Sequence, residues 1–423
     1  MVYVVNQDNE PLMPTNRHGK IRHLLKLGKA KVIKREPFTI KLLYETTNYT
    51  QDLTLGVDTG SGTFATAVSN DKSEIIYMSE VALRNDIHDK MIRRASYRRT
   101  RRNRKTRYRK PRFLNRKNSI KTDRFSPTMT SKFNSHIKEI EFIKSILPIK
   151  NLILETGTFD PHLMKNPALY NENYRKWGYQ HGPNYGYANT RDKVLNRDNH
   201  TCQCCKGKRK DSRLDVHHIV FRSNGGDDTE ENLITLCHLC HEDLHNGKIN
   251  PKFNGKKRGN LKYATQMNSI RTQLLRHYAE AIETFGYVTK ENRFNLNIPK
   301  EHYFDACVIA TGGNPLKFNT DIVYFKKSVP DGDYRQTDGR HSEKHLTTGK
   351  IYGFRKFDKV LYKNNIYFVF GRMSSGYAKL MNIKNDIQIF TNPKIPKFIN
   401  MKRISARKSV ITQGIKVNSP IVL

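Results

Sequence analysis

The chain has 423 residues, of which 36% are hydrophobic, so it is long enough for two or three domains with their own cores. It contains 76 Lys and Arg against 39 Asp and Glu, a net charge of +37, and a polyanion is therefore the expected partner. Apolar runs of membrane-spanning length and a secretory signal are both missing from the sequence. We therefore expect a cytoplasmic protein with no membrane partner.

The N-terminal residues alternate short apolar and basic stretches. They predict a strand at Val2–Val5, a rigid turn at Pro11–Pro14, a basic helix at Arg17–Lys26 and further strands up to Tyr44. A buried strand follows at Leu53–Asp58, which ends in a carboxylate next to a glycine-rich hairpin. A carboxylate in this position is well placed to hold a metal ion over a phosphate. By itself, the feature is weak evidence for a metal site, and a structural role is the more common reason for such a residue.

The most basic stretch runs from Asp86 to Lys117. Fourteen of the 25 residues from Arg93 to Lys117 are Lys or Arg, and helix formers dominate as far as Pro111. The pattern predicts one long helix with cationic side chains all round, which has too few apolar positions to be held by a core. We expect it to contact phosphates rather than to be a solvated face. The residues assigned to nucleic-acid binding are Arg93, Arg94, Arg98, Arg99, Arg101, Arg102, Arg104 and Arg107.

After this stretch the strand arrangement of Asp58 is repeated. A helix predicted at Ser131–Ile146 leads to a second apolar strand that ends in Glu155. The next thirty or so residues are rich in Tyr, Asn, Gly and Pro, and include the only tryptophan, Trp177. This composition predicts a linker, whose aromatic and basic residues could also stack on nucleic-acid bases.

The segment from Cys202 to His245 holds five of the six cysteines and five of the 16 histidines. Its two C-x-x-C pairs have the spacing of zinc knuckles, and the middle thiol, Cys204, is left as a non-ligand. Four sulfur ligands leave no open position for water, so this Zn²⁺ is expected to be structural. The surrounding residues are polar, which argues against cysteines that act only as small buried hydrophobes. The predicted zinc ligands are Cys202, Cys205, Cys237 and Cys240.

A second pattern runs through the same segment. It consists of paired histidines in a strand-like stretch, a downstream asparagine and two histidines on one helix face: His217, His218, Asn232, His241 and His245. The pattern resembles the ββα-metal motif of HNH nucleases. A purely structural zinc finger is the alternative.

The HNH resemblance implies a role for each of these residues. His218 would be the general base that activates water, and Asn232 would orient its ring. His217 and His241 would hold one divalent cation, taken as Mg²⁺. His245 would be a further ligand or a phosphate contact, with Asp215 as an auxiliary residue.

A third acid follows a helix predicted at Leu261–Phe285. His302 and Asp305 lie on one face of an apolar helix, a spacing that is common and mostly structural when it occurs alone. Together with Asp58 and Glu155, however, Asp305 completes the acidic set of an RNase H-like two-metal nuclease. The HNH-like segment lies between the second and third acids. Two nuclease centres in one basic chain imply that two strands are cut.

The C-terminal residues predict a small antiparallel barrel. The predicted strands are 350–354, 359–362, 366–370, 377–381 and 387–390.

The order of these parts resembles IscB, a family of transposon-associated, RNA-guided DNA endonucleases. The resemblance implies an α/β multidomain fold: a split RNase H-like (RuvC) core, an arginine-rich bridge helix, an inserted ββα-metal HNH domain with zinc knuckles and a small C-terminal β-barrel. The implied boundaries are a Pro-Leu-Met-Pro module at 1–50, RuvC-like segments at 51–85, 118–160 and 251–322 (the last with a linker), the bridge helix at 86–117, a linker at 161–189, the HNH domain at 190–250 and the C-terminal domain at 323–423.

The resemblance also implies the activity and the partners. A guide RNA, the ωRNA, would select a double-stranded DNA target, and the C-terminal domain would read a target-adjacent motif. The HNH centre would cut the guide-paired strand. The RuvC-like centre would cut the displaced strand with two Mg²⁺ ions, using Asp58, Glu155, His302 and Asp305. A monomer in a 1:1 ribonucleoprotein in a prokaryotic cytoplasm is expected. A protein-read HNH homing or restriction-type nuclease and a non-catalytic RNA-binding zinc protein are the alternatives.

Overall fold

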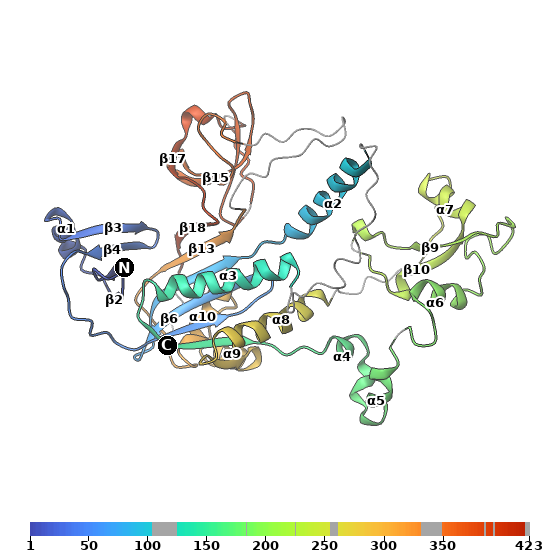
Figure 1. Cartoon of the computed structure of the whole chain (residues 1–423), viewed down its shortest axis with the longest axis horizontal. Coiled ribbons are helices and arrows are strands. Elements are labelled where there is room, and N and C mark those ends of the chain that lie inside the picture. The colour runs from blue at the N-terminus through green and yellow to red at the C-terminus, as the bar shows by residue number, and fades with distance from the viewer. Residues whose placement is uncertain are drawn as a thin grey trace. The chain divides into compact units, whose positions relative to one another are not determined.

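A computed structural model describes residues 1–103, 125–182, 184–224, 226–253, 261–330, 349–384, 386–391 and 394–418. The chain forms two compact units (Figure 1). Unit 1 combines Met1–Thr158 with Gln266–Leu423, and unit 2 is Phe159–Thr265. Unit 2 is therefore inserted in the sequence of unit 1, between the second and third predicted acids.

An eight-stranded sheet forms the centre of unit 1. Its order is β11-β8-β5-β6-β7-β13-β18, and β12 pairs with β7. β5 pairs in parallel with β8 and antiparallel with β6, while β8 pairs in parallel with β11. The strands are β5 (Leu53–Asp58), β6 (Thr63–Asn70), β7 (Glu74–Ala82), β8 (Ile149–Thr156), β11 (Ile282–Phe285), β12 (Lys317–Phe318), β13 (Ile322–Ser328) and β18 (Val410–Lys416).

Helices pack on both faces of this sheet, which explains why its central strands are apolar along most of their length. On one face, Leu55 and Val57 share a core with Ile140 of α3 and Leu274 of α8. On the other face, alanines of β6 pack with the apolar helix α10. The helices are α3 (Pro127–Lys144), α8 (Lys262–His277), α9 (Gly286–Asn295) and α10 (His302–Ala310).

Gly56 allows α10 to lie directly on β5. A Cβ atom on Gly56 would lie 2.4 Å from the backbone nitrogen of Ala310 and 2.7 Å from the carbonyl oxygen of Ala306. Any side chain would therefore displace the helix. Gly56 and Asp58 are two residues apart on one strand and face the same side of the sheet. The close approach thus places α10 on the face that carries Asp58.

The N-terminal residues form a separate four-stranded sheet of order β2-β1-β4-β3. The prediction of a turn at Pro11–Pro14 is wrong. These residues belong to the edge strand β2, which pairs antiparallel with β1. Proline lacks an amide hydrogen and is tolerated at a sheet edge. The elements are β1 (Val2–Val5), β2 (Pro11–Thr15), α1 (His18–Lys26), β3 (Ala30–Arg35) and β4 (Phe38–Leu42).

The C-terminal region differs from the expected barrel. Within the described residues it is an open four-stranded sheet of order β16-β15-β14-β17. Strands β13 and β18 belong to the large sheet, so the boundary predicted at residue 323 falls inside β13. Residues 350–354 and 387–390 form isolated bridges rather than strands. The strands are β14 (Lys359–Tyr362), β15 (Asn365–Arg372), β16 (Ala378–Met381) and β17 (Lys402–Ser405).

Two helix predictions have different outcomes. The basic stretch is helical as predicted over α2 (Ile87–Asn103), and its continuation, 104–124, lies outside the described residues. The helix predicted at Leu261–Phe285 ends earlier, at His277, and its last four residues form the edge strand β11. None of the described helices is long and apolar enough to cross a membrane.

Unit 2 contains a small ββα domain preceded by short helices. The linker predicted at 161–189 includes α4 (Pro161–Lys165), a 3-10 turn η2 (Pro167–Tyr170) and α5 (Glu172–Gln180), so it is more ordered than expected. The domain itself consists of α6 (Thr190–Arg197), β9 (Leu214–His218), the 3-10 turns η3 (Arg222–Asn224) and η4 (Glu230–Asn232), β10 (Leu233–Cys237) and α7 (His238–His245).

Replacing Gly56 by alanine should lower the free energy of unfolding of unit 1 by about 1–3 kcal/mol, because the added methyl group meets backbone atoms of α10. Gly62→Ala is the matched control, since no atom lies within 4 Å of its Cβ position. Urea unfolding of both variants measures the difference. Equal midpoints would contradict the close approach of α10.

Candidate functional site

Asp58 and Glu155 lie side by side at the carboxyl ends of two parallel strands. They are direct partners in the register of β5 and β8. His302 begins α10, and its Nδ1 donates a hydrogen bond to Asp58 Oδ2 at 2.7 Å, across 244 positions of sequence. The structure therefore brings these three predicted residues together.

Asp305 lies in the first turn of α10 and is paired with a buried arginine. Arg293 of α9 places its Nε 3.0 Å from Asp305 Oδ1, and its Nη1 donates to the carbonyl oxygen of Ile298 at 3.1 Å. Arg293 is not among the residues predicted from the sequence, because a single arginine in an amphipathic helix carries no local signal of such a contact.

The acidic groups of this centre have shifted pKa values. Burial, followed by the Asp58 carboxylate, raises the pKa of Glu155 to about 7, against a hydrogen bond from Thr289. Burial and Asp58 likewise raise the pKa of Asp305 to about 6, against the charge of Arg293. The hydrogen bond to Asp58 raises the pKa of His302 to about 8. Such mutual shifts are typical of carboxylates held together in a functional site.

The chemistry of this centre fits Mg²⁺, which prefers oxygen ligands. Glu155 Oε2 is buried without a hydrogen-bond partner, as expected for a ligand atom. In the part of the chain that the structure describes, however, the three carboxylates are not among the groups whose ligand atoms all lie within 4.8 Å of one another. Asp58 and Asp305 turn toward His302 and Arg293 instead. Binding of one ion by all three carboxylates would require their oxygens to move closer together, whereas two ions could be held by carboxylates farther apart.

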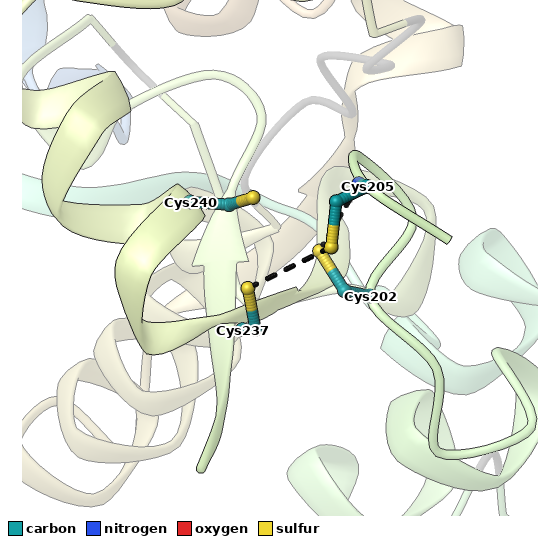
Figure 2. Close-up of side chains that lie close together, drawn as sticks. All are labelled: Cys202, Cys205, Cys237 and Cys240. Atoms are coloured by element: carbon teal, nitrogen blue, oxygen red, sulfur yellow. Dashed lines mark hydrogen bonds between the residues drawn. The ribbon is translucent and has the colours of Figure 1, made fainter. Parts of the chain in front are cut away.

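The four predicted zinc ligands form one cluster in unit 2 (Figure 2). Their sulfur atoms all lie within 4.8 Å of one another, and Cys205 Sγ is 3.9 Å from Cys237 Sγ. Cys204 is outside the group, as predicted. Four thiols in this arrangement fit one tetrahedral Zn²⁺. Cys237 ends β10 and Cys240 lies in α7, so the cluster ties the first turn of α7 to the strand before it.

His217, His241 and His245 form a second group whose ligand atoms lie within 4.8 Å of one another. His217 comes from β9 and the other two from α7, with His241 Nε2 and His245 Nε2 3.2 Å apart. Burial, followed by His241 and His245, lowers the pKa of His217 to about 4. A neutral imidazole is the form that binds a metal.

Asp215 lies on the far side of this group. Its Oδ2 is 3.1 Å from His238 Nδ1 and 3.5 Å from His241 Nδ1. With Nδ1 of His241 facing this carboxylate, Nε2 faces His245. A carboxylate behind a ligating histidine is a common arrangement that fixes the ring for metal binding. Asp215 was predicted only as an auxiliary residue, and His238 was not predicted.

His218 and Asn232 are arranged differently from expectation. Asn232 is fully buried, and its hydrogen bonds go to the backbone of Val220 and to the carbonyl oxygen of Asp227, not to the His218 ring. Asn232 therefore closes the loop after β9 rather than holding His218 directly. The His218 ring instead contacts Asp228, with Nε2 2.7 Å from Oδ1.

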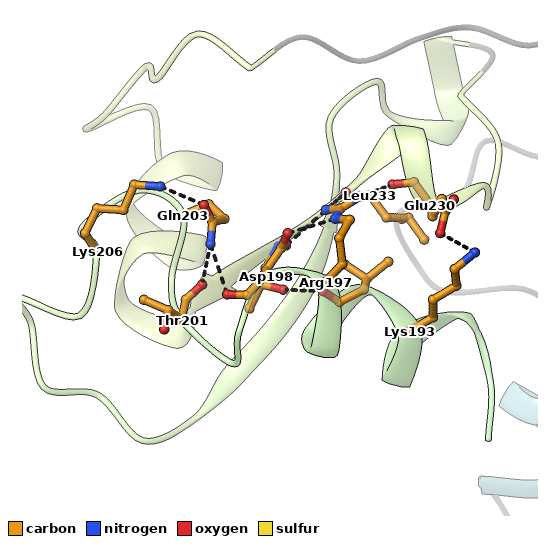
Figure 3. A network of polar contacts seen from close by, with 10 residues as sticks. Lys193, Arg197, Asp198, Thr201, Gln203, Lys206, Glu230 and Leu233 are labelled. Atoms are coloured by element: carbon orange, nitrogen blue, oxygen red, sulfur yellow. Dashed lines mark hydrogen bonds and ion pairs between the residues drawn. The ribbon is translucent and has the colours of Figure 1, made fainter. Parts of the chain in front are cut away.

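Arg197 fixes the chain on both sides of Asn232 (Figure 3). Its Nη1 donates to the carbonyl oxygen of Glu230 at 2.6 Å, and its Nη2 donates to that of Leu233 at 2.9 Å. Asp198 pairs with the same guanidinium and accepts a hydrogen bond from the Thr235 amide at 2.9 Å. The helix α6 is thereby joined to β10.

The described residues include only some of the arginines predicted to bind nucleic acid. Arg93, Arg94, Arg98 and Arg99 are exposed on α2. Arg101 and Arg102 belong to the same helix, but their side chains lie outside the described residues, as do Arg104 and Arg107 entirely.

Two protein families match the chain. Residues 2–177 match the RRXRR protein family, and residues 202–247 match the HNH endonuclease family. The second match covers both the cysteine cluster and the histidine group, so the chain carries an HNH endonuclease domain. The chain is IscB-like. This likeness was predicted from the order of its motifs and is supported by the RRXRR and HNH regions together.

Individual relatives match only parts of the IscB-like chain. The type IV methyl-directed restriction enzyme EcoKMcrA of Escherichia coli strain K12 is 49% identical over 35 residues, which are 8% of this chain and 13% of the enzyme. Anaredoxin of Nostoc sp. strain PCC 7120 is 29% identical over 65 residues, 15% of this chain and 83% of that protein. The chain thus spans a small fraction of the restriction enzyme.

Two solved structures of Streptococcus thermophilus Cas9 also match. The complex with an AGGA PAM gives a TM-score of 0.30 at 13% identity, over 44% of this chain and 26% of that one. The complex with an AGAA PAM gives a TM-score of 0.33 at 11% identity, over 60% of this chain and 32% of that one. The IscB-like chain covers about a third of Cas9 or less.

Cys240→Ser should remove one zinc ion per chain and destabilise unit 2, because zinc binding contributes about 10 kcal/mol or more to the folding of such sites. Cys204→Ser is the matched control, since its thiol lies outside the cluster. Zinc content and limited proteolysis of the two proteins measure the effect. A zinc-replete, protease-resistant Cys240→Ser protein would contradict the assignment.

Proposed function

We propose that the chain is an RNA-guided, metal-dependent endonuclease that cuts both strands of a DNA duplex. The main support for the proposal is that the chain has two separate clusters of side chains of the kinds used in nucleases. One is the carboxylate centre of Asp58, Glu155 and Asp305 in unit 1, and the other is the histidine group of the HNH domain in unit 2. One centre for each strand is the simplest use of two nuclease sites.

In the HNH centre, His218 would act as the general base. Its imidazole takes a proton from a water molecule, and the water oxygen bonds to phosphorus. The bond from phosphorus to the leaving nucleotide oxygen then breaks, and that oxygen takes up a proton from solvent. A divalent cation held by His217, His241 and His245 would supply stabilisation of the negative charge on the phosphate.

The two centres would prefer different cations. Three imidazole nitrogens suit a first-row transition ion better than Mg²⁺, which binds oxygen ligands. The proposed ion of the histidine group is therefore a later first-row cation such as Ni²⁺ or Zn²⁺ rather than the Mg²⁺ expected from the sequence. The carboxylate centre keeps Mg²⁺, for which Asp58, Glu155 and Asp305 are the proposed ligands.

The guide RNA is the natural partner of the basic helix α2. Four exposed arginines, Arg93, Arg94, Arg98 and Arg99, lie within two turns, in a chain whose net charge is +37. A protein-read HNH nuclease is the second candidate, favoured by the short match to a restriction enzyme. That alternative gives no role to the carboxylate centre or to the arginines.

His218→Ala should leave a nickase that cuts only the displaced strand, and Asp58→Ala one that cuts only the guide-paired strand. Loss of a general base should slow the affected strand by about 100- to 10,000-fold. His200→Asn, an exposed histidine of unit 2 at a positive φ of 46°, is the control that should cut both strands. Strand-specific end labels report the products. Equal slowing of both strands in either variant would contradict one centre per strand.

Replacing Arg93, Arg94, Arg98 and Arg99 with glutamine should weaken RNA binding. The slope of log affinity against log salt should fall by about 0.7–0.9 for each phosphate that the variant no longer neutralises. A variant with glutamine at four exposed basic positions near α1, namely Lys20, Arg22, Lys26 and Lys29, makes the same change in net charge. If both variants bind RNA equally weakly, net charge rather than α2 determines RNA binding.

A further inference from the structure

An acid outside the predicted catalytic set holds the His218 ring. Asp228 Oδ1 lies 2.7 Å from His218 Nε2. An ionised carboxylate accepts hydrogen bonds but donates none, so Nε2 must carry the proton. In the neutral ring, the other nitrogen, Nδ1, then has the free lone pair that a general base requires.

Asp228 is itself held in place from two directions. Arg222 directs Nε and Nη2 at the same Oδ1, at 2.9 and 2.7 Å. The loop backbone next to Asp228 is fixed by Asn232, whose Nδ2 donates to the carbonyl oxygen of Asp227 at 2.8 Å. Gly226 makes the tight turn possible, since a Cβ there would lie 1.8 Å from the Val220 carbonyl oxygen and 2.8 Å from Asn232 Nδ2.

We propose that Asp228 is a positioning residue of the HNH centre, which fixes His218 in the tautomer with Nε2 protonated and leaves Nδ1 as the base. The proposal rests on the proposed nuclease function. When Nδ1 takes the proton from water, the ring becomes a cation, and the Asp228 carboxylate opposite Nε2 stabilises that charge. Asn232 acts one step further away, because it shapes the loop that carries Asp228.

If Asp228 had a purely structural role, its removal would have a different effect on cleavage. The side chains of Arg222 and Asp228 are 69% and 62% exposed. Ion pairs this exposed add little to stability. If the interaction were only a surface ion pair, its removal would leave cleavage by His218 unchanged.

The test compares rates of a single round of cutting by the full ribonucleoprotein at saturating target. Asp228→Ala should slow cleavage of the guide-paired strand by about 10- to 100-fold, the usual effect of losing such a supporting group. Cleavage of the displaced strand and target binding should not change. Asp228→Asn, which keeps an acceptor oxygen, should recover part of the rate.

A double-variant comparison tests whether Asp228 acts through His218. In a His218→Ala background, Asp228→Ala should cause no further slowing. Asp227→Ala is the control from the same loop, because its carboxylate bonds the Thr229 amide at 3.2 Å and the Thr229 hydroxyl at 2.6 Å rather than His218. If Asp227→Ala slows cleavage, it should slow it by the same factor in the wild-type and His218→Ala backgrounds.

Two outcomes separate this proposal from the nuclease proposal itself. Wild-type cutting of the paired strand together with an undiminished Asp228→Ala rate would overturn the role of Asp228 alone. If the wild-type chain does not cut that strand, the nuclease proposal fails, and nitrogen-15 NMR of the histidine rings in the full chain still tests Asp228. The His218 signal, identified from its absence in His218→Gln, should show protonated Nε2 and become mixed in Asp228→Ala. A protonated Nδ1 in the wild-type chain would overturn the proposal.

Discussion

The parallel pairing of β5 with β8 is the constraint on which unit 1 depends. It sets two carboxylates, Asp58 and Glu155, next to each other at one edge of the sheet, where burial and mutual repulsion raise the pKa of Glu155 to about 7. Folding must offset this repulsion. His302 does so for Asp58, and Arg293 does so for Asp305. His302 and Asp305 reach the centre because the missing side chain at Gly56 lets α10 lie against β5.

Unit 2 depends on a different arrangement, in which one short helix contributes residues to two candidate metal-binding groups. The cysteine cluster joins the start of α7 to the end of β10, and the same helix presents His241 and His245 to His217 of β9. The cluster therefore sets the position of the histidine group without taking part in it. Arg197 adds a second restraint, since it binds the backbone on both sides of Asn232.

Residues with local signatures could be predicted from the sequence. The C-x-x-C pairs form one cluster, the paired histidines lie on a strand, and Asp58 and Glu155 lie at strand ends, as the sequence predicted. Arg293 and Asp228 could not be predicted, because their partners are defined by a tertiary contact and by a loop conformation. The strand β11 was missed at the end of a predicted helix, although Ile282, Thr284 and Phe285 are residue types common in strands, and its pairing with β8 settles the extended conformation. The boundary of the C-terminal domain at residue 323 was wrong because strand patterns alone do not show that β13 and β18 join the large sheet.

The separation of 244 positions between His302 and Asp58 also sets an order of events during synthesis. All the residues of unit 2, its cysteine cluster and histidine group included, are synthesised before α10. The inserted domain can thus fold while the large sheet still lacks β11, β13 and β18. The carboxylate residues are complete only once α10 has been made, so a nascent chain can form the histidine group of unit 2 before it can form the carboxylate group.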